Sequence, residues 1–327
     1  MKVLFIGGTG NISTASSCLA VERGIELWHI NRGKSVCGVH GVRTITCDVT
    51  NSAALETALA PHKWDCVVNW IAFNAKDVER DIALFSGKTK HYIYISSGSC
   101  YDLPQHSPVI TENTPLGNPC WQYSRDKIAG EQALMRAHIE KGFPGTIVRP
   151  SHTYSTVIPI TLGGWNKYNA VNRMKQGKPT VVHGDGTSLW VVTHAEDFAL
   201  GLVGLLNLEA AIGEAVHITS DEVLTWNQIY RHVGAALGLE PNLVHVASDT
   251  ICALEPSYTG TLLGDKAHSV MFDNSKIRSL VPSFVPVIPF SEGIRTTIEW
   301  FEASNERQYI DPDIDILLDK LAAIACT

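Results

Sequence analysis

The chain has 327 residues, of which 45% are apolar and 18% charged, so it can bury a large core and is not dominated by disorder. Asp and Glu number 33 against 26 Lys and Arg, which gives a net charge of −7. Because binding to a phosphate backbone needs a basic field, this balance argues against a nucleic-acid partner. We find no apolar run long enough for a membrane span and no signal-peptide core, and we therefore expect a cytoplasmic protein.

Short apolar runs alternate with helical segments over the first 150 residues. Strands are expected at 3–6, 25–30, 43–47, 66–71, 91–95 and 146–148, and helices at 12–23, 52–59, 75–85 and 124–141. Continuous apolar strands that alternate with helices are typical of a parallel sheet with both faces covered. The pattern therefore predicts the α/β class, with a Rossmann-type doubly wound parallel sheet.

The alternation ends after residue 150, but 195–208 is again helical in pattern and 215–219 again resembles a strand. We therefore predict a dinucleotide-binding Rossmann domain of residues 1–150 plus about 195–220. A smaller, discontinuous C-terminal substrate-binding domain would take about 151–194 plus 221–327. The last helix should begin at Asp311-Pro312 and pack its apolar stripe on its own domain, with a homodimer contact as the alternative.

A glycine-rich segment, Gly7-Gly8-Thr9-Gly10-Asn11-Ile12-Ser13, lies between the first strand and the first helix. Glycines here permit a tight turn and a close approach of the backbone to a pyrophosphate at the helix N-terminus. Ser13 takes the place of the usual third glycine. The segment predicts a dinucleotide site, with cofactor contacts from Gly7, Thr9, Gly10, Asn11 and Ile12.

The ends of the second and third strands should lie beside the adenosine of such a cofactor. Asn31 stands where an acidic residue would bind both ribose hydroxyls, and Arg32 follows it. A neutral amide beside a guanidinium can accept a 2′-phosphate, so NAD(P) is expected with a preference for NADP. Asp48 and Val49 are predicted to contact the adenine. In the alternative interpretation, Asn31 binds the ribose of NAD, Arg32 is solvated and Asp48 is a turn residue.

A serine cluster, a tyrosine and a lysine follow the fifth strand. Ser97 and Ser99 come at its carboxyl end, where ligands of open α/β sheets bind. Tyr123 and Lys127 are four residues apart and share one helix face, so the ammonium should lower the pKa of the phenol and bind the nicotinamide ribose. Ser97 can hold a substrate oxygen against the phenol.

Together these motifs resemble the extended short-chain dehydrogenase/reductase family, the NAD-dependent epimerase/dehydratase group that includes UDP-glucose 4-epimerase. Residues 148–154, 184–186, 190–197 and 272–300 resemble its later segments, so the resemblance covers nearly the whole chain. It implies that Ser97 and Tyr123 are catalytic and that Lys127 assists them. It also implies cofactor contacts from Trp70, Ile71, Ala72, Tyr123, Lys127 and Pro150, and substrate contacts from Ser97, Ser99, Tyr123 and His152.

The resemblance implies an NAD(P)-dependent epimerase that transiently oxidises a nucleotide sugar to a keto intermediate. Simple reduction or oxidation of a sugar or another small ketone would use the same residues and is the first alternative. The Asp-Glu pair that follows the catalytic hydroxyl in the 4,6-dehydratases of this family is absent, because Gly98-Ser99 occupies that position. The pattern therefore argues against 4,6-dehydration.

A second alternative is a non-enzymatic RNA-binding protein. Residues 264–266 and 272–276 resemble a chloroplast branch of the same family that binds RNA stem-loops. The net charge of −7 and the intact serine, tyrosine and lysine argue against it. The eight cysteines form no C-x-x-C pair and are expected as reduced thiols, and no metal site is predicted.

Overall fold

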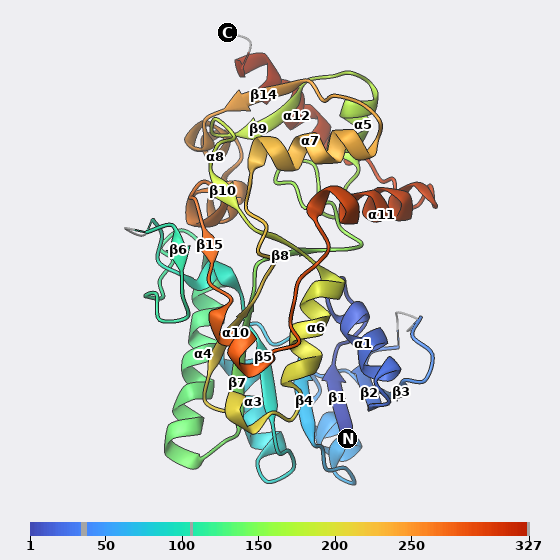
Figure 1. Ribbon diagram of the computed structural model, residues 1–327, viewed down its shortest axis with the longest axis vertical. Coiled ribbons are helices and arrows are strands. Elements are labelled where there is room, and N and C mark those ends of the chain that lie inside the picture. Colours follow the sequence, from blue (N-terminus) through green and yellow to red (C-terminus); the bar gives the residue numbers. More distant parts are fainter. Residues whose placement is uncertain (34–37, 105–106, 326–327) are drawn as a thin grey trace.

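A computed structural model describes residues 1–33, 38–104 and 107–325. Its centre is a seven-stranded parallel sheet in the order β12-β7-β5-β4-β1-β2-β3, which confirms the predicted Rossmann-type fold (Figure 1). The strands are β1 (Lys2–Ile6), β2 (Glu26–Asn31), β3 (Arg43–Thr46), β4 (Cys66–Asn69), β5 (Tyr92–Ile95), β7 (Gly145–Pro150) and β12 (Ala215–Ile218).

Both faces of this sheet are buried, because successive side chains of each strand point to opposite sides. In β1, Val3 and Phe5 pack with α1, α6 and α10, whereas Leu4 and Ile6 pack with α2, α3 and α4. The helices are α1 (Ser13–Glu22), α2 (Ser52–Leu59), α3 (Ala75–Phe85), α4 (Gln122–Lys141), α6 (Ala195–Leu205) and α10 (Ser275–Leu280). This double cover explains why the strands have continuous apolar sequences.

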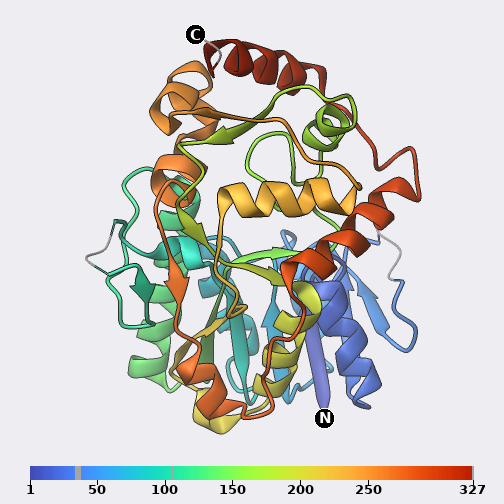
Figure 2. The same ribbon diagram turned by 45° about the horizontal axis from the view of Figure 1, so that its top comes forward.

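Three segments from the second half of the chain, α6, β12 and α10, return to the sheet. β12 pairs with β7 and forms one edge, as the strand pattern at 215–219 predicts. α10 was expected in the substrate domain, but it packs against β12, and both views place it in the lower half with the sheet (Figures 1 and 2). Its Ile277 is fully buried and packs on the face of the sheet that α1 and α6 also cover. The other predicted domain limits remain predictions.

The upper half of the molecule in Figure 1 contains small strand pairs and helices. The pairs are β8 (His152–Tyr154) with β11 (Val192–His194), β9 (Thr180–His183) with β14 (Leu243–Val246), β10 (Leu189–Trp190) with β13 (Leu224–Thr225), and β6 (Val109–Ile110) with β15 (Met271–Phe272). The helices are α5 (Asn169–Lys175), α7 (Trp226–Ala236), α8 (Ser248–Leu254), α9 (Thr259–Thr261), α11 (Phe290–Glu302) and α12 (Pro312–Ala325). Across both halves, the short helical turns are η1 (Gly98–Cys100), η2 (Glu209–Ala211), η3 (Pro256–Tyr258) and the π-helical η4 (Leu262–Lys266).

The last helix packs within the chain. Leu318 and Leu321 of α12 are buried in a cluster with Val181 of β9 and Val246 of β14. Among the residues that the structure describes, no helix has both the length and the apolar character needed to cross a bilayer.

The topology brings the predicted motifs to one edge of the sheet. β1 is central, with β2 on one side and β4 on the other, so the chain reverses direction across the sheet at this point. Ligands of open α/β sheets bind at such a switch point, beyond the carboxyl ends of the strands. The segments that follow β1, β4 and β5 meet there.

Candidate active site

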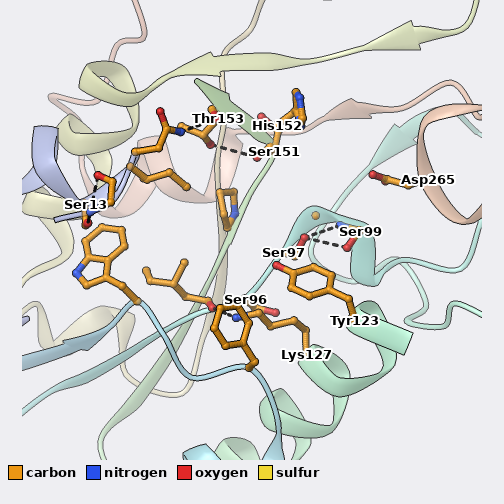
Figure 3. A pocket seen from close by; sticks show the side chains of 18 of the residues that line it. Ser13, Ser96, Ser97, Ser99, Tyr123, Lys127, Ser151, His152, Thr153 and Asp265 are labelled. Atoms are coloured by element: carbon orange, nitrogen blue, oxygen red, sulfur yellow. Dashed lines mark hydrogen bonds between the residues drawn. The ribbon is translucent and has the colours of Figure 1, made fainter. Parts of the chain in front are cut away.

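A cavity of about 900 Å³ opens at this edge and extends into the upper half of the molecule (Figure 3). It is lined by thirteen of the residues predicted for the site, namely Gly7, Thr9, Gly10, Asn11, Ile12, Trp70, Ile71, Ser97, Ser99, Tyr123, Lys127, Pro150 and His152. The other five predicted residues, Asn31, Arg32, Asp48, Val49 and Ala72, are not part of its lining. The structure therefore groups the catalytic and phosphate-loop candidates but not those predicted for the adenosine.

The glycine loop combines two tight positions with one open position. Gly7 and Gly8 have φ angles of +99° and +105°, which side chains rarely adopt. A Cβ on Gly8 would lie 2.6 Å from Nε2 of His29, so this position has no room for a side chain. A Cβ on Gly10 would contact only Ser13 Oγ, at 3.5 Å. Gly10 thus leaves space beside the start of α1, where the first N–H groups have no partner within the helix.

Ser13 fits the position of the third glycine because its side chain turns back to the loop. Its Oγ accepts a hydrogen bond from the N–H of Gly10 at 2.8 Å, and the residue is 3% exposed. Ser16, Ser17 and Ala20 complete a row of small buried side chains on this face of α1. The helix can therefore lie close to the sheet without the third glycine.

The side chain of Asn11 binds the protein itself. Its amide nitrogen donates to the carbonyl of Thr153 at 2.9 Å, and its oxygen accepts from the N–H of Thr156 at 2.9 Å. Asn11 thus joins the glycine loop to β8 and the turn after it. Its backbone and the second N–H of its amide remain for the predicted cofactor contact.

The segment after β4 forms an apolar wall of the cavity. Asn69 fixes its turn by accepting hydrogen bonds from the N–H groups of Ile71 and Ala72, both at 2.8 Å. Trp70 packs edge-on against Phe5, with ring centroids 5.4 Å apart. The side chain of Phe73, which the sequence interpretation missed, is 49% exposed and lines the cavity.

The serine cluster and the tyrosine come from two neighbouring elements. Ser97 follows β5, and its hydroxyl lies 2.9 Å from that of Ser99, which lies 2.8 Å from that of Ser124 in α4. Tyr123 is in the first turn of α4, and Lys127 is one turn later. Figure 3 shows the Tyr123 phenol directed toward Ser97 and Ser99. A substrate oxygen in this space could contact both a serine hydroxyl and the phenol.

Lys127 is 2% exposed, and two backbone carbonyls hold its ammonium group. Nζ donates to the oxygen of Ala72 at 2.7 Å and to that of Ile95 at 2.8 Å. Ala72 therefore acts through its carbonyl rather than as cavity lining. An ammonium has three N–H donors, so one remains for a ligand. Nζ also lies 4.7 Å from the ring centre of Phe73 and 5.8 Å from that of Tyr123.

Burial controls the ionisation of this pair. It lowers the pKa of Lys127 to about 8 and raises the pKa of Tyr123 to about 12. Cys100 and Asp265 add to the rise of the Tyr123 pKa, whereas a hydrogen bond from Ser97 opposes it. The prediction that Lys127 lowers the pKa of the phenol is therefore wrong in this structure. The ammonium is directed at two carbonyls, and burial of the phenol is the largest cause of its raised pKa.

The residues predicted for the adenosine end are engaged in turns. Asn31 accepts a hydrogen bond from the N–H of Gly33 at 2.9 Å, and Arg32 is exposed. Asp48 accepts from the N–H and the hydroxyl of Thr50 at 3.0 and 2.8 Å, as expected for a turn aspartate. These contacts fit the alternative interpretation of Asp48 and leave the guanidinium of Arg32 accessible.

The upper end of the cavity is lined mainly by residues that the sequence interpretation did not assign to the site. They are Trp121, Trp165, Trp190, Thr261, Asp265, Lys266 and Phe272. Trp165 follows a glycine pair and is 46% exposed, and its ring centre lies 5.2 Å from that of His152. Burial and the charge of Lys266 hold the pKa of His152 well below its usual range, so this imidazole is neutral. These residues come from separate segments of the chain, so no single motif contains them all, and the resemblances at 190–197, 264–266 and 272–300 gave them no role in the site.

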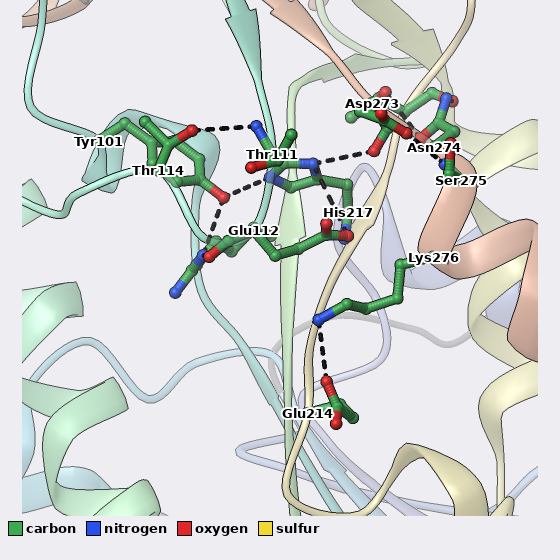
Figure 4. Close-up of polar contacts among 12 residues, drawn as sticks. Tyr101, Thr111, Glu112, Thr114, Glu214, His217, Asp273, Asn274, Ser275 and Lys276 are labelled. Atoms are coloured by element: carbon green, nitrogen blue, oxygen red, sulfur yellow. Dashed lines mark hydrogen bonds and ion pairs between the residues drawn. The ribbon is translucent and has the colours of Figure 1, made fainter.

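A buried polar network lies beneath the cavity. Arg149 makes an ion pair with Glu131 at 2.6 Å and donates to the hydroxyl of Tyr101 at 2.8 Å. That hydroxyl also bonds Nε2 of His217, whose Nδ1 lies 3.2 Å from the carbonyl of Asp273 (Figure 4). The network attaches the segment after β15 to β12.

The same segment makes two further attachments. Lys276 pairs with Glu214 at 2.8 Å, as Figure 4 shows, and Asn274 donates to the carbonyl of Thr219 at 2.8 Å. Residues 272–276, which resemble the RNA-binding branch, therefore have structural contacts inside this chain.

Comparisons with known proteins concern the family and the fold of the chain. A model of the "NAD dependent epimerase/dehydratase family" matches residues 3–218. The chain is 27% identical over 296 residues to a 2'-dehydrokanamycin reductase of Streptomyces kanamyceticus, covering 87% of this chain and 80% of that protein. It is 24% identical to the chloroplast stem-loop binding protein of 41 kDa b of Arabidopsis thaliana, covering 75% of this chain and 65% of that protein.

The solved structures share the fold. A UDP-glucuronic acid 4-epimerase from Bacillus cereus, in complex with UDP-glucuronic acid and NAD, superimposes with a TM-score of 0.74. The identity is 18%, and the match covers 93% of this chain and 99% of that one.

Proposed function

The chain belongs to the NAD dependent epimerase/dehydratase family, and we propose that it reduces a keto group of a sugar with hydride from NAD(P)H. The observation that carries this proposal is the grouping of Ser97, Tyr123 and Lys127 on one wall of a cavity that begins at the glycine loop. The raised pKa of Tyr123 supports reduction rather than oxidation, because a neutral phenol is a proton donor. The similarity to a reductase over 87% of the chain also supports it.

The loop and the lysine fit a dinucleotide. The space beside Gly10 and the start of α1 would accept the pyrophosphate, and the third N–H of Lys127 would bind the nicotinamide ribose. When bound, the cofactor supplies the hydride that the protein itself cannot provide. Ile71 and Pro150 would exclude water from the reacting end.

The protein's own groups would handle the substrate oxygen. Ser97 would hold the carbonyl oxygen, oriented by its hydrogen bond to Ser99, which is in turn fixed by Ser124. Tyr123 would donate its phenolic proton to this oxygen as the carbonyl becomes an alcohol. His152 lies across the cavity and would contact the sugar.

We further propose a preference for NADP over NAD. Arg32 is exposed just after β2, and Asn31 carries no charge that would repel a 2′-phosphate. The oxygen of Asn31 accepts a hydrogen bond from the N–H of Gly33, which fixes the turn that carries Arg32. An exposed guanidinium beside a neutral amide supports a guanidinium–phosphate interaction over the alternative interpretation for NAD.

Epimerisation of a nucleotide sugar, the function predicted first from the sequence, is the second candidate. The intact Ser97, Tyr123 and Lys127 favour it, since an epimerase would use the same three groups. Tyr123 would accept a proton in its first, oxidative step and donate one in its second, reductive step, and the raised pKa of Tyr123 favours only the second. RNA binding has weaker support, because Asp265 is buried in the cavity wall and residues 272–276 are engaged in the buried network.

The test is an activity assay on two sets of compounds. Keto sugars and UDP-, GDP- and dTDP-sugars are incubated with NADPH or NADH, with products followed by chromatography and the cofactor by absorbance. Reduction predicts that one cofactor is consumed for each alcohol formed. Isomerised nucleotide sugars without cofactor consumption would identify an epimerase and refute the proposal.

A further inference from the structure

The upper end of the cavity, here called the substrate end, has no net charge among its described lining residues. Among the described residues that line the cavity, the ionic side chains are Lys127 at the cofactor end and the adjacent Asp265 and Lys266 at the other. Nζ of Lys266 lies 3.0 Å from a carboxylate oxygen of Asp265, and no arginine contributes to this lining. A nucleotide diphosphate would bring negative charge to a wall whose cation is already paired.

The ion pair is held in a fixed position relative to the serine cluster. Asp265 and Lys266 lie on the π-helical turn η4. Such turns are rare in proteins as a whole, but they occur frequently at functional sites. Asn118 donates to the carbonyl of Gly264 at 2.7 Å and to that of Ser99 at 3.1 Å. This one side chain therefore connects the charged turn to the loop that carries Ser97. In Figure 3, Asp265 lies across the cavity from Tyr123.

Indole rings form much of the surrounding wall. Lys266 Nζ lies 5.7 Å from the ring centres of both Trp121 and Trp190. Trp165 has a φ of +61°, a strained conformation for a bulky residue, and is locked there by two backbone hydrogen bonds to Ile158, at 2.6 and 2.8 Å. Such strain persists where the surrounding structure enforces it and is concentrated at ligand sites. Here it presents an exposed indole to the cavity.

We propose that this end binds a polyhydroxylated sugar ring that carries no phosphate, an inference that rests on the proposed reductase function. The carboxylate of Asp265 accepts from one ring hydroxyl or amine, and the ammonium of Lys266 donates to its neighbour. The indole of Trp165 covers the apolar face of the ring. The pair thus gives polar recognition without the surplus positive charge that a diphosphate needs.

The test measures binding rather than turnover. Calorimetry with NADP⁺-saturated protein compares glucose, galactose, glucosamine, cellobiose and the glucosamine dimer with UDP-glucose, UDP-galactose and GDP-mannose. We expect at least one free sugar to bind at least ~10-fold more tightly than every nucleotide sugar. Tightest binding by a nucleotide sugar, or no binding by any free sugar, would overturn the inference.

Variants locate the binding to this wall. For the free sugar that binds best, Trp165→Ala and the double change Asp265→Asn with Lys266→Met should each weaken binding at least ~10-fold while cofactor affinity is retained. The double change removes both charges, so neither remains buried and unpaired. Tyr309→Ala is the matched control, because Tyr309 is 52% exposed and does not line the cavity. Unchanged sugar affinity in both site variants would contradict the assignment.

The same data separate the two proposals. Binding of free sugars without reduction of any keto sugar would refute the proposed function alone. Cofactor-consuming reduction of a ketone on a nucleotide sugar would refute this inference and leave the hydride chemistry intact.

Discussion

The two ends of the cavity are built differently. The cofactor end is formed by segments that directly follow β1, β4 and β5 in one parallel sheet, together with α4. The substrate end is formed by Trp165, Trp190 and the η4 turn, which lie far apart in the sequence and outside that sheet. The fold therefore fixes the cofactor end, whereas the substrate end depends on how individual loops pack. We expect changes at one end to leave binding at the other intact.

The largest effect is expected at Tyr123, where the two ends meet. Tyr123→Phe removes the proton donor but keeps the ring, so turnover should fall ~10²–10⁴-fold while cofactor and sugar affinities are retained. Steady-state kinetics and calorimetry measure these quantities. Tyr94→Phe is the matched control, since the buried Tyr94 hydroxyl has no hydrogen-bond partner in the described part of the chain. Equal losses in the two variants would show that Tyr123 has only a packing role.

The next effect should be confined to the cofactor end. Gly10→Glu places a carboxylate where the pyrophosphate is expected, so cofactor affinity should fall roughly 100-fold. Gly10→Ala is the control, because its Cβ would meet only Ser13 Oγ, at 3.5 Å. Calorimetry with NADPH and with the preferred sugar measures both ends. A folded Gly10→Glu protein with normal NADPH affinity would refute the loop assignment.

Much of the cofactor end could be predicted from the sequence, because parallel topology puts the carboxyl ends of neighbouring strands together. The positions of Gly10, Ser97 and Lys127 follow from strand order and helical spacing. The roles of Asn11 and Ala72 could not be predicted in this way. Asn11 bonds to Thr153 of β8, and Ala72 accepts a hydrogen bond from Lys127. The raised pKa of Tyr123 also depends on burial, which spacing does not reveal.

The substrate end could not be predicted in the same way. Trp165 lines this end from a loop in which its backbone is strained, and Asp265 lines it from a π-helical turn. Neither backbone geometry has a reliable sequence signal. The return of α10 to the sheet was missed for the same reason, because six residues carry too short a pattern. A long-range contact such as that from Asn118 to Gly264 is known only from the folded chain.

The preference for NADP over NAD tests the role of Arg32, which lies beyond the cavity lining at the cofactor end. Arg32→Ala should lower the preference for NADP over NAD at least ~10-fold, as expected for the loss of a charged hydrogen bond. Dissociation constants for both cofactors give the ratio. Arg23→Ala, which removes another exposed charge from the same domain, should leave it unchanged. An identical ratio in Arg32→Ala and wild type would contradict the role of Arg32.

The smallest effect is a pH dependence of cofactor binding. Burial lowers the pKa of Lys127 to about 8, so the ammonium is present below this pH and lost above it. The neutral amine has only two donors for Ala72, Ile95 and the ribose, so affinity should fall by up to ~10-fold from about pH 7 to about pH 9. Calorimetry across this range measures the fall. Lys127→Met should bind more weakly with little pH dependence, and an equal slope in both proteins would assign it to another group.

The most direct test of the reductase proposal is the transfer of label from the cofactor to the product. The protein is incubated with a keto sugar that it converts and with NADPH or NADH deuterated at the transferable position, and the product is analysed by mass spectrometry. Our account predicts an alcohol that is heavier by one deuterium, at the carbon that was the ketone, and no label transfer in Tyr123→Phe beyond its residual turnover. A product isomer without deuterium, formed while the cofactor keeps its label, would contradict it.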